Sequence, residues 1–201
     1  MSKKIIPLNL CYKGERDYIH STDIYQELVS NLVESGESIK LFSLSIHKII
    51  RNQCDIIVTE SRENIDTKNK VAQFLIQKNV KILGYLSESN KVVNCRYEYN
   101  EELMENSIKI VENTIIQTED ISFKPIELIS YMTKILHNKL LPPYGKKWMF
   151  TKVETAELFN DANKNRYKIK LNNNFNNKLT KSEIIYSNKI VGHIYFSLVQ
   201  L

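Results

Sequence analysis

The sequence contains few of the residues that bend or crosslink a chain: 5 glycines, 4 prolines and 3 cysteines among 201 residues. The cysteines are an odd number and widely spaced, at Cys11, Cys54 and Cys95, and the sequence contains no Cys-x-x-Cys pair. The sequence therefore indicates neither a disulfide framework nor a thiolate metal site. The apolar runs are too short to cross a membrane, and the polar start at residues 1–7 does not resemble a signal peptide. We expect a cytoplasmic protein with no membrane partner.

Several nucleotide, metal and nucleophile motifs are also missing from the sequence. It contains no Walker loop, no Rossmann glycine fingerprint, no His-Glu-x-x-His helix and no Gly-x-Ser-x-Gly elbow. The 4 histidines are dispersed and are not accompanied by a cysteine cluster. We therefore predict no metal and no resident cofactor.

The charge is mildly basic, because 28 Lys and Arg residues face 23 Asp and Glu residues, for a formal net charge of +5. The cations are scattered and form no dense block of the kind that binds nucleic acid. This balance suits an acidic partner such as a phosphorylated carrier or a nucleotide-tailed small molecule. RNA, the third alternative, is the least favoured, and no nucleic-acid partner is predicted. The hydrophobic content of 42% is enough for a substantial core.

The first half begins with a polar turn that leads directly into an amphipathic helix. Residues 4–12 predict a strand and residues 13–16 a bend. Ser21, Thr22 and Asp23 are typical helix-starting residues, so His20 is expected just ahead of a helix N-terminus. The helix carries an apolar stripe at helical spacing and ends before Gly36. Further strands are predicted at residues 39–50, 55–59, 70–77, 80–87 and 91–99.

The second half repeats this order after the acidic stretch at residues 97–105. A strand at 107–118 and a turn at 121–125 precede a helix whose apolar face runs from Ile126 to Leu140 and ends before Pro142. Strands are then predicted at residues 148–158, 167–172, 181–186 and 189–200. Residues 19–24 align with 123–128, and residues 81–84 with 189–192. We therefore predict an internal duplication, with repeats at 1–105 and 106–201.

Each half thus has a strand, one long helix and several antiparallel strands that wrap the helix, and a segment that contains His20 leads into the first helix. This element order resembles the hotdog fold of acyl-thioester enzymes. The resemblance implies an α+β double hotdog of the thioesterase/dehydratase superfamily, with an antiparallel sheet around two long helices. It also implies an acyl-thioester tunnel between the helices, a histidine or carboxylate near one helix start and a partner acid in the other half. No more specific family is identified.

His20 and Asp23 are the first candidates for chemistry. They are three residues apart at a helix start, where a carboxylate could activate water or attack a thioester carbonyl that the helix end polarises. The alternative is that Asp23 caps the helix, helped by Gln26, and that His20 packs in the turn. Glu127 is the counterpart of Asp23 in the second half and a candidate partner acid. Its alternative role is a favourable interaction with the helix dipole.

Two further groups are candidate substrate-binding residues. Arg16 and Tyr18 could bind a phosphate or donate a hydrogen bond to a thioester oxygen, or could fix the loop. The turn that contains Lys146, Lys147 and Trp148 combines cations with aromatic rings and suits a nucleotide or phosphopantetheine end. The three remaining histidines, His47, His137 and His193, are expected to be structural.

The predicted function is an acyl-thioester processing enzyme that acts on acyl-CoA or an acyl carrier protein, of thioesterase or dehydratase type. The carrier, coenzyme A or phosphopantetheine, is then part of the substrate. The alternative is a non-catalytic module that binds an acyl ligand or serves assembly. Association into a homodimer is left open.

Overall fold

The computed structural model describes residues 4–59, 69–159 and 166–200. The chain divides into two compact units, Met1–Asn100 and Glu101–Leu201. The sequence placed the boundary after residue 105, in the acidic stretch that begins the second unit. Each unit is described by itself.

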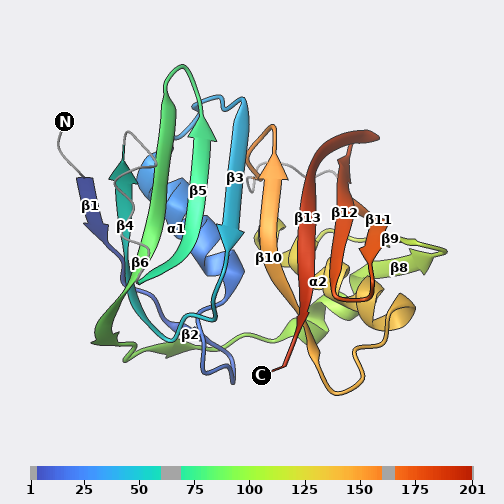
Figure 1. Cartoon of the computed structure of the whole chain (residues 1–201). Coiled ribbons are helices and arrows are strands. Elements are labelled where there is room, and N and C mark those ends of the chain that lie inside the picture. Colours follow the sequence, from blue (N-terminus) through green and yellow to red (C-terminus); the bar gives the residue numbers. More distant parts are fainter. Residues whose placement is uncertain (1–3, 60–68, 160–165, 201) are drawn as a thin grey trace. The chain divides into compact units, whose positions relative to one another are not determined.

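The first unit combines an antiparallel sheet with one helix. The strands lie in the order β1-β4-β6-β5-β3, and α1 spans Ser21–Leu32 between β1 and β3 in the chain. Figure 1 shows these strands side by side. The strand bounds are β1 Lys4–Pro7, β3 Leu41–Ile46, β4 Asn52–Thr59, β5 Lys70–Gln77 and β6 Lys81–Val92.

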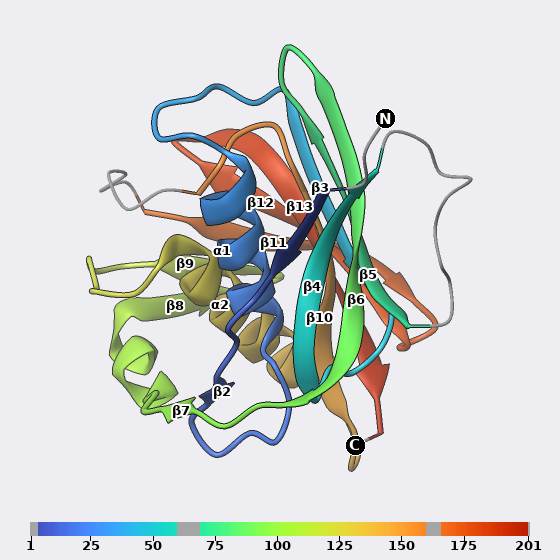
Figure 2. The same ribbon diagram turned by 90° about the vertical axis from the view of Figure 1, so that its left-hand side faces the viewer.

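The helix α1 lies against one face of this sheet (Figure 2). Ile24 and Leu28 on α1, like Phe42 and Leu44 on β3, are almost completely buried. The ring of Tyr25 meets the ring of Phe42 edge to face, with centroids 4.9 Å apart. The helical spacing of the α1 residues and the alternation of the β3 residues therefore direct both pairs of side chains toward a common core.

A second, much smaller pairing joins the two ends of this unit. The short strands β2 (Tyr12–Lys13) and β7 (Arg96–Tyr97) are parallel, with Tyr12 opposite Arg96 and Lys13 opposite Tyr97. A disulfide joins Cys11 to Cys95 directly before them. The prediction that the cysteines form no disulfide is therefore wrong for this pair, while Cys54 is free and buried. The 84-residue separation gives no local signal of the pairing.

The second unit has the strand order β8-β9-β11-β12-β13-β10, with α2 (Pro125–Leu140) between β9 and β10 in the chain. The helix packs against β9, β10 and β11. A 3-10 helix, η2, spans Glu101–Ser107 at the start of this unit. The strand bounds are β8 Ile108–Val111, β9 Thr114–Gln117, β10 Lys147–Thr155, β11 Lys168–Phe175, β12 Leu179–Tyr186 and β13 Lys189–Val199.

The strands predicted at residues 107–118 and 4–12 are both interrupted. The strand predicted at 107–118 is the hairpin β8-β9, because Glu112 adopts a φ of 54° and reverses the chain. The strand predicted at 4–12 leaves the sheet after Pro7. There the side chain of Gln53 accepts a hydrogen bond from the Leu10 amide at 2.7 Å and donates one to the Leu10 carbonyl at 2.9 Å. These side-chain hydrogen bonds satisfy the backbone groups of Leu10 in place of a neighbouring strand.

The two aligned segments occupy similar local positions in the two units. His20 and Lys124 are the N-cap residues of their helices, and Gly84 and Gly192 lie near the start of the last strands. The sheet orders differ, however, because β6 lies between β4 and β5, whereas β13 lies between β12 and β10. The duplication therefore stays a prediction.

The core of the second unit contains a histidine. His137 on α2 is fully buried between the rings of Trp148 and Phe196, with centroids 5.2 and 5.4 Å away. Its Nε2 lies 3.3 Å from the hydroxyl of Ser182. Burial lowers the pKa of His137 to about 4. The expected structural role for this histidine agrees with a neutral core side chain.

Among the described residues, no helix is long and apolar enough to cross a membrane.

The buried neutral state of His137 predicts acid sensitivity of the second unit. Below pH 6.5 the imidazole binds a proton in the unfolded chain, whereas the native His137 stays neutral down to about pH 4. The free energy of unfolding therefore falls between these two pH values and levels off once the folded and unfolded states are both protonated. The loss is about 3 kcal/mol. Trp148, the single tryptophan, has its ring centroid 5.2 Å from that of His137, and its fluorescence in urea titrations reports on this unit. His137→Asn should reduce this pH dependence, whereas His47→Asn, in the first unit, should leave the dependence that Trp148 reports in place.

Candidate functional site

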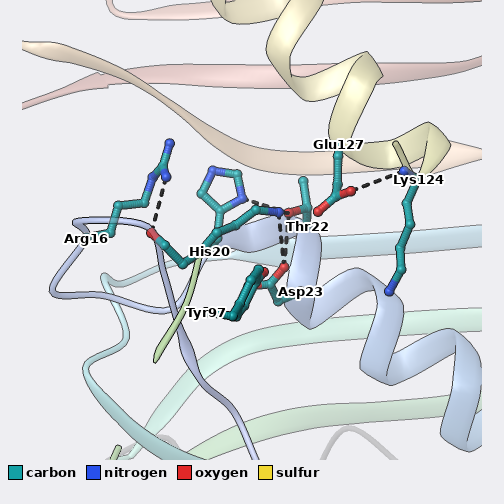
Figure 3. Close-up of polar contacts among 8 residues, drawn as sticks. Arg16, His20, Thr22, Asp23, Tyr97, Lys124 and Glu127 are labelled. Atoms are coloured by element: carbon teal, nitrogen blue, oxygen red, sulfur yellow. Dashed lines mark hydrogen bonds and ion pairs between the residues drawn. The ribbon is translucent and has the colours of Figure 1, made fainter. Parts of the chain in front are cut away.

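The candidate site lies at the N-terminus of α1 in the first unit. His20 is the N-cap residue in an extended conformation, and its side chain makes no capping hydrogen bond. Asp23 lies in the first turn, three residues further. Its carboxylate contacts Lys13 and Tyr97, which lie outside the helix (Figure 3).

Lys13 supplies the central contact of this site. Its side chain comes from β2 and has an exposed fraction of 0%. The ammonium lies 3.4 Å from Oδ1 of Asp23 and donates to Oγ1 of Thr22 at 3.3 Å. Withdrawing an ammonium from water is costly unless a counter-charge and hydrogen-bond acceptors replace the solvent. Asp23 is therefore the counter-ion of a buried lysine.

Two tyrosines complete the surroundings of this ion pair. The hydroxyl of Tyr97 donates to Oδ2 of Asp23 at 2.9 Å. The ammonium of Lys13 lies 3.9 Å from the centroid of the Tyr99 ring, which is cation-π contact. Both carboxylate oxygens of Asp23 thus have partners, one charged and one neutral.

A hydrogen-bonded chain connects the imidazole of His20 to this carboxylate through Thr22. Nδ1 of His20 lies 2.7 Å from Oγ1 of Thr22, and that hydroxyl lies 3.4 Å from Oδ1 of Asp23. Because Lys13 is only a donor, Thr22 must accept from it and has a single proton to give. If Thr22 donates to Asp23, Nδ1 of His20 is the protonated nitrogen and Nε2 carries the lone pair. If Thr22 donates to His20, the tautomer is reversed.

The candidate binding residues near this helix differ in exposure. Arg16 is half-buried and donates from Nη1 to the carbonyl of Lys13 at 3.2 Å. Tyr18 is buried. Arg16 therefore takes part in holding the loop, in agreement with the second of its two predicted roles.

The turn before β10 does not hold its three candidates together. Lys146 and Lys147 are exposed, whereas Trp148 is 4% exposed and belongs to the core. The indole Nε1 of Trp148 donates to the carbonyl of Leu141 at 2.9 Å. The predicted place of Trp148 beside the two cations is therefore wrong, because strand alternation turns Trp148 inward from Lys147.

Glu127 lies in the first turn of α2 in the second unit. Its Oε2 accepts a hydrogen bond from the backbone amide of Lys124 at 3.1 Å. This is the carboxylate half of a capping box, and it satisfies a donor at the helix start. The predicted pairing of Glu127 with Asp23 stays a prediction.

Sequence reasoning missed Lys13, Tyr97 and Tyr99 as members of the site. The sequence predicts a bend at Lys13, and it predicts a strand at residues 91–99 and an acidic stretch at 97–105 for the two tyrosines. Lysine is almost always exposed, so its burial is not expected. No residue near Lys13 in the sequence signals its burial. In the part of the chain that the structure describes, no group of three or more His, Cys, Asp and Glu residues is arranged to hold a metal ion.

Comparison with known proteins finds no matching family model and no matching curated protein. Among solved structures, the TesB protein of Mycobacterium avium subspecies paratuberculosis is 7% identical, with 97% of this chain and 92% of that chain covered and a TM-score of 0.47. A monomeric dehydratase domain from a trans-AT polyketide synthase is 11% identical, with coverages of 99% and 100% and a TM-score of 0.48.

The dehydratase domain of PpsC from Mycobacterium tuberculosis, solved with C12:1-CoA, is 5% identical, with coverages of 98% and 94% and a TM-score of 0.49. These are hotdog-fold proteins of the superfamily that the sequence resembles. At such identities and TM-scores, no activity is transferred from them to this chain.

The buried ion pair predicts a large cost when one partner is removed. Lys13→Met leaves the Asp23 carboxylate without its cation and should lower the free energy of unfolding by about 3 kcal/mol. Urea unfolding followed by circular dichroism measures this change.

The double variant Lys13→Met/Asp23→Leu removes both charges and should recover most of the loss, since a neutral pair needs no compensation. Equal stability of the single and the double variant would contradict the ion-pair role. Glu127→Gln is the matched control, because the Gln amide oxygen can keep the capping hydrogen bond to the Lys124 amide, so the free energy of unfolding should change little.

Proposed function

We propose that the protein is an acyl-thioester processing enzyme of thioesterase or dehydratase type, built as a double hotdog, with His20 as its proton-transfer group. The observation that carries the proposal is the chain of hydrogen bonds from His20 through Thr22 to Asp23. The substrate class comes from the resemblance of the element order to the hotdog fold. The acyl chain is carried by coenzyme A or by an acyl carrier protein.

In this proposal Nδ1 of His20 donates to Thr22, whose hydroxyl donates to Asp23. The lone pair on Nε2 then accepts a proton from the attacking water in hydrolysis, or from the carbon beside the carbonyl in dehydration. The negative charge of Asp23 stabilises the imidazolium that forms, and Thr22 keeps the ring oriented. In hydrolysis the proton passes from His20 to the sulfur of the leaving thiol. In dehydration it passes from His20 to the hydroxyl on the next carbon, which leaves as water while the carbon–carbon double bond forms. The backbone amides at the start of α1 support the developing oxyanion.

The remaining candidates take secondary roles in this proposal. Asp23 orients the chain and is not itself the base, because its two oxygens already have Lys13 and Tyr97 as partners. Glu127 is kept as the partner acid from the second unit. The exposed cations Lys146 and Lys147 suit the phosphate groups of either carrier. Arg16 and Tyr18 border the site from the loop before α1.

The cytoplasmic location and a homodimeric state are also part of the proposal. A disulfide persists most readily in an oxidising compartment. A cytoplasmic location therefore implies that the Cys11–Cys95 bond is exposed to thiol reductants.

A non-catalytic acyl-binding or assembly module is the alternative. It is favoured by the same contacts of Asp23 and by the capping bond of Glu127, because both predicted acids have structural partners. In that case the ion pair and the cap serve stability alone.

Native mass spectrometry with a panel of acyl-CoA thioesters and acylated carrier protein separates these functions. We expect a released product with the unchanged protein and its loss with His20→Asn, at nearly unchanged stability. His47→Asn is the matched control, since His47 is exposed directly after β3 and should keep full turnover. Bound ligand without product would support the binding module. Absence of both across the panel would overturn the thioester proposal.

The tautomer of His20 provides a second test. We expect long-range ¹H–¹⁵N spectra near neutral pH to place the proton of the neutral His20 ring on Nδ1. Thr22→Val removes the hydroxyl and should shift the tautomer toward Nε2. A ring protonated on Nε2 in the unchanged protein would contradict the proposed proton path.

A further inference from the structure

The parallel pair β2-β7 brings two groups of the site, Lys13 and Tyr97, to Asp23. Lys13 lies two residues after Cys11, and Tyr97 lies two residues after Cys95. The disulfide therefore precedes both residues by the same distance and holds the two strands in register. We call the segments 11–14 and 95–99, together with the disulfide, the clasp.

The backbone pairing of the clasp is short. Beside the β2-β7 ladder, the Tyr12 amide donates to the Cys95 carbonyl and the Gly14 amide to the Tyr97 carbonyl, both at 2.9 Å. Arg96 is exposed and donates from Nη1 to the carbonyls of Gly14 and Arg16. Strands of two residues are shorter than the usual range of three to ten, and a parallel pair is the weaker kind.

The clasp is also reachable from solvent. Both disulfide cysteines are half-buried, and Tyr97 is 38% exposed. Lys13, by contrast, is completely covered, and the ring of Tyr99 forms part of that cover. The burial of Lys13 is therefore coupled to a segment that one accessible covalent bond attaches to the rest of the unit, together with the backbone pairing and the hydrogen bonds of Arg96 and Tyr97.

We infer that the Cys11–Cys95 disulfide is a redox-controlled closure of the candidate site, and that a dithiol reductant opens the clasp and exposes the ammonium of Lys13. A thiolate of the reductant attacks one cysteine sulfur and releases the other cysteine as a thiol. The second thiol of the reductant then displaces the protein, so that two cysteine thiols and one oxidised cyclic disulfide result.

The consequence for the site follows from the contacts of Asp23. When segment 95–99 leaves, Asp23 loses the hydroxyl of Tyr97, and Lys13 loses its aromatic cover. Opening the clasp thus hydrates the ion pair that anchors Thr22 and His20. This accessibility change is independent of any activity, while its effect on turnover rests on the proposed function.

The test measures the accessibility of Lys13 and of Cys54 in the full chain. Wild-type protein, untreated or reduced with dithiothreitol, is first alkylated with iodoacetamide and freed of small reagents. It is then reductively dimethylated, and the modified residues are quantified by peptide mass spectrometry. The variant Cys11→Ser/Cys95→Ser is treated in the same way without reductant. Lys40, an exposed lysine of the same unit, is the reference for labelling rate.

We expect the labelling rate of Lys13 relative to Lys40 to rise on the order of tenfold or more after reduction and in the double variant, because local opening replaces complete burial. Cys54, buried in β4, should stay unalkylated in native buffer. Protection of Lys13 in all forms would overturn the inference. Simultaneous reaction of Lys13 and Cys54 would also overturn it, because the disulfide would then hold the entire unit and not the clasp alone.

Discussion

The charge of Lys13, completely removed from water, is the constraint on which the first unit's candidate site depends. An ammonium without solvent requires a nearby anion, and this requirement determines where Asp23 points. The same ammonium donates to Thr22, so the hydroxyl has only one proton for His20 or Asp23. The orientations of the imidazole and of the carboxylate thus depend on a lysine that comes from outside the helix.

The burial of that lysine depends in turn on two segments, 11–14 and 95–99, that are distant in the sequence and pair within the unit. Segment 95–99 returns after the last strand of the sheet and covers the ammonium with an aromatic ring. The covalent bond between Cys11 and Cys95 adds to the hydrogen bonds of strands that have only two residues each. A disulfide that closes so long a loop contributes about 4.5 kcal/mol in the chain-entropy model.

The two helix starts show how one local pattern acquires different roles. Asp23 and Glu127 are both three residues after the N-cap residue. Glu127 reaches back to the Lys124 amide and caps α2, whereas Asp23 turns to Lys13 and Tyr97. A carboxylate in a first turn is favourable in either case because of the helix dipole. The difference arises from the short strand β2, which places a cation beside α1.

The sequence by itself determined the periodic elements and the start of each helix. Alternation predicted β5 at residues 70–77 with the bounds observed, and the apolar stripe predicted α2 to within one residue. It also placed His20 at the start of α1. Only the tertiary structure decided that Cys11 pairs with Cys95, that Lys13 is buried and that Trp148 faces the core. Periodicity is a local property of neighbouring residues, whereas a counter-ion, a disulfide partner and an aromatic cover come from segments distant in the chain.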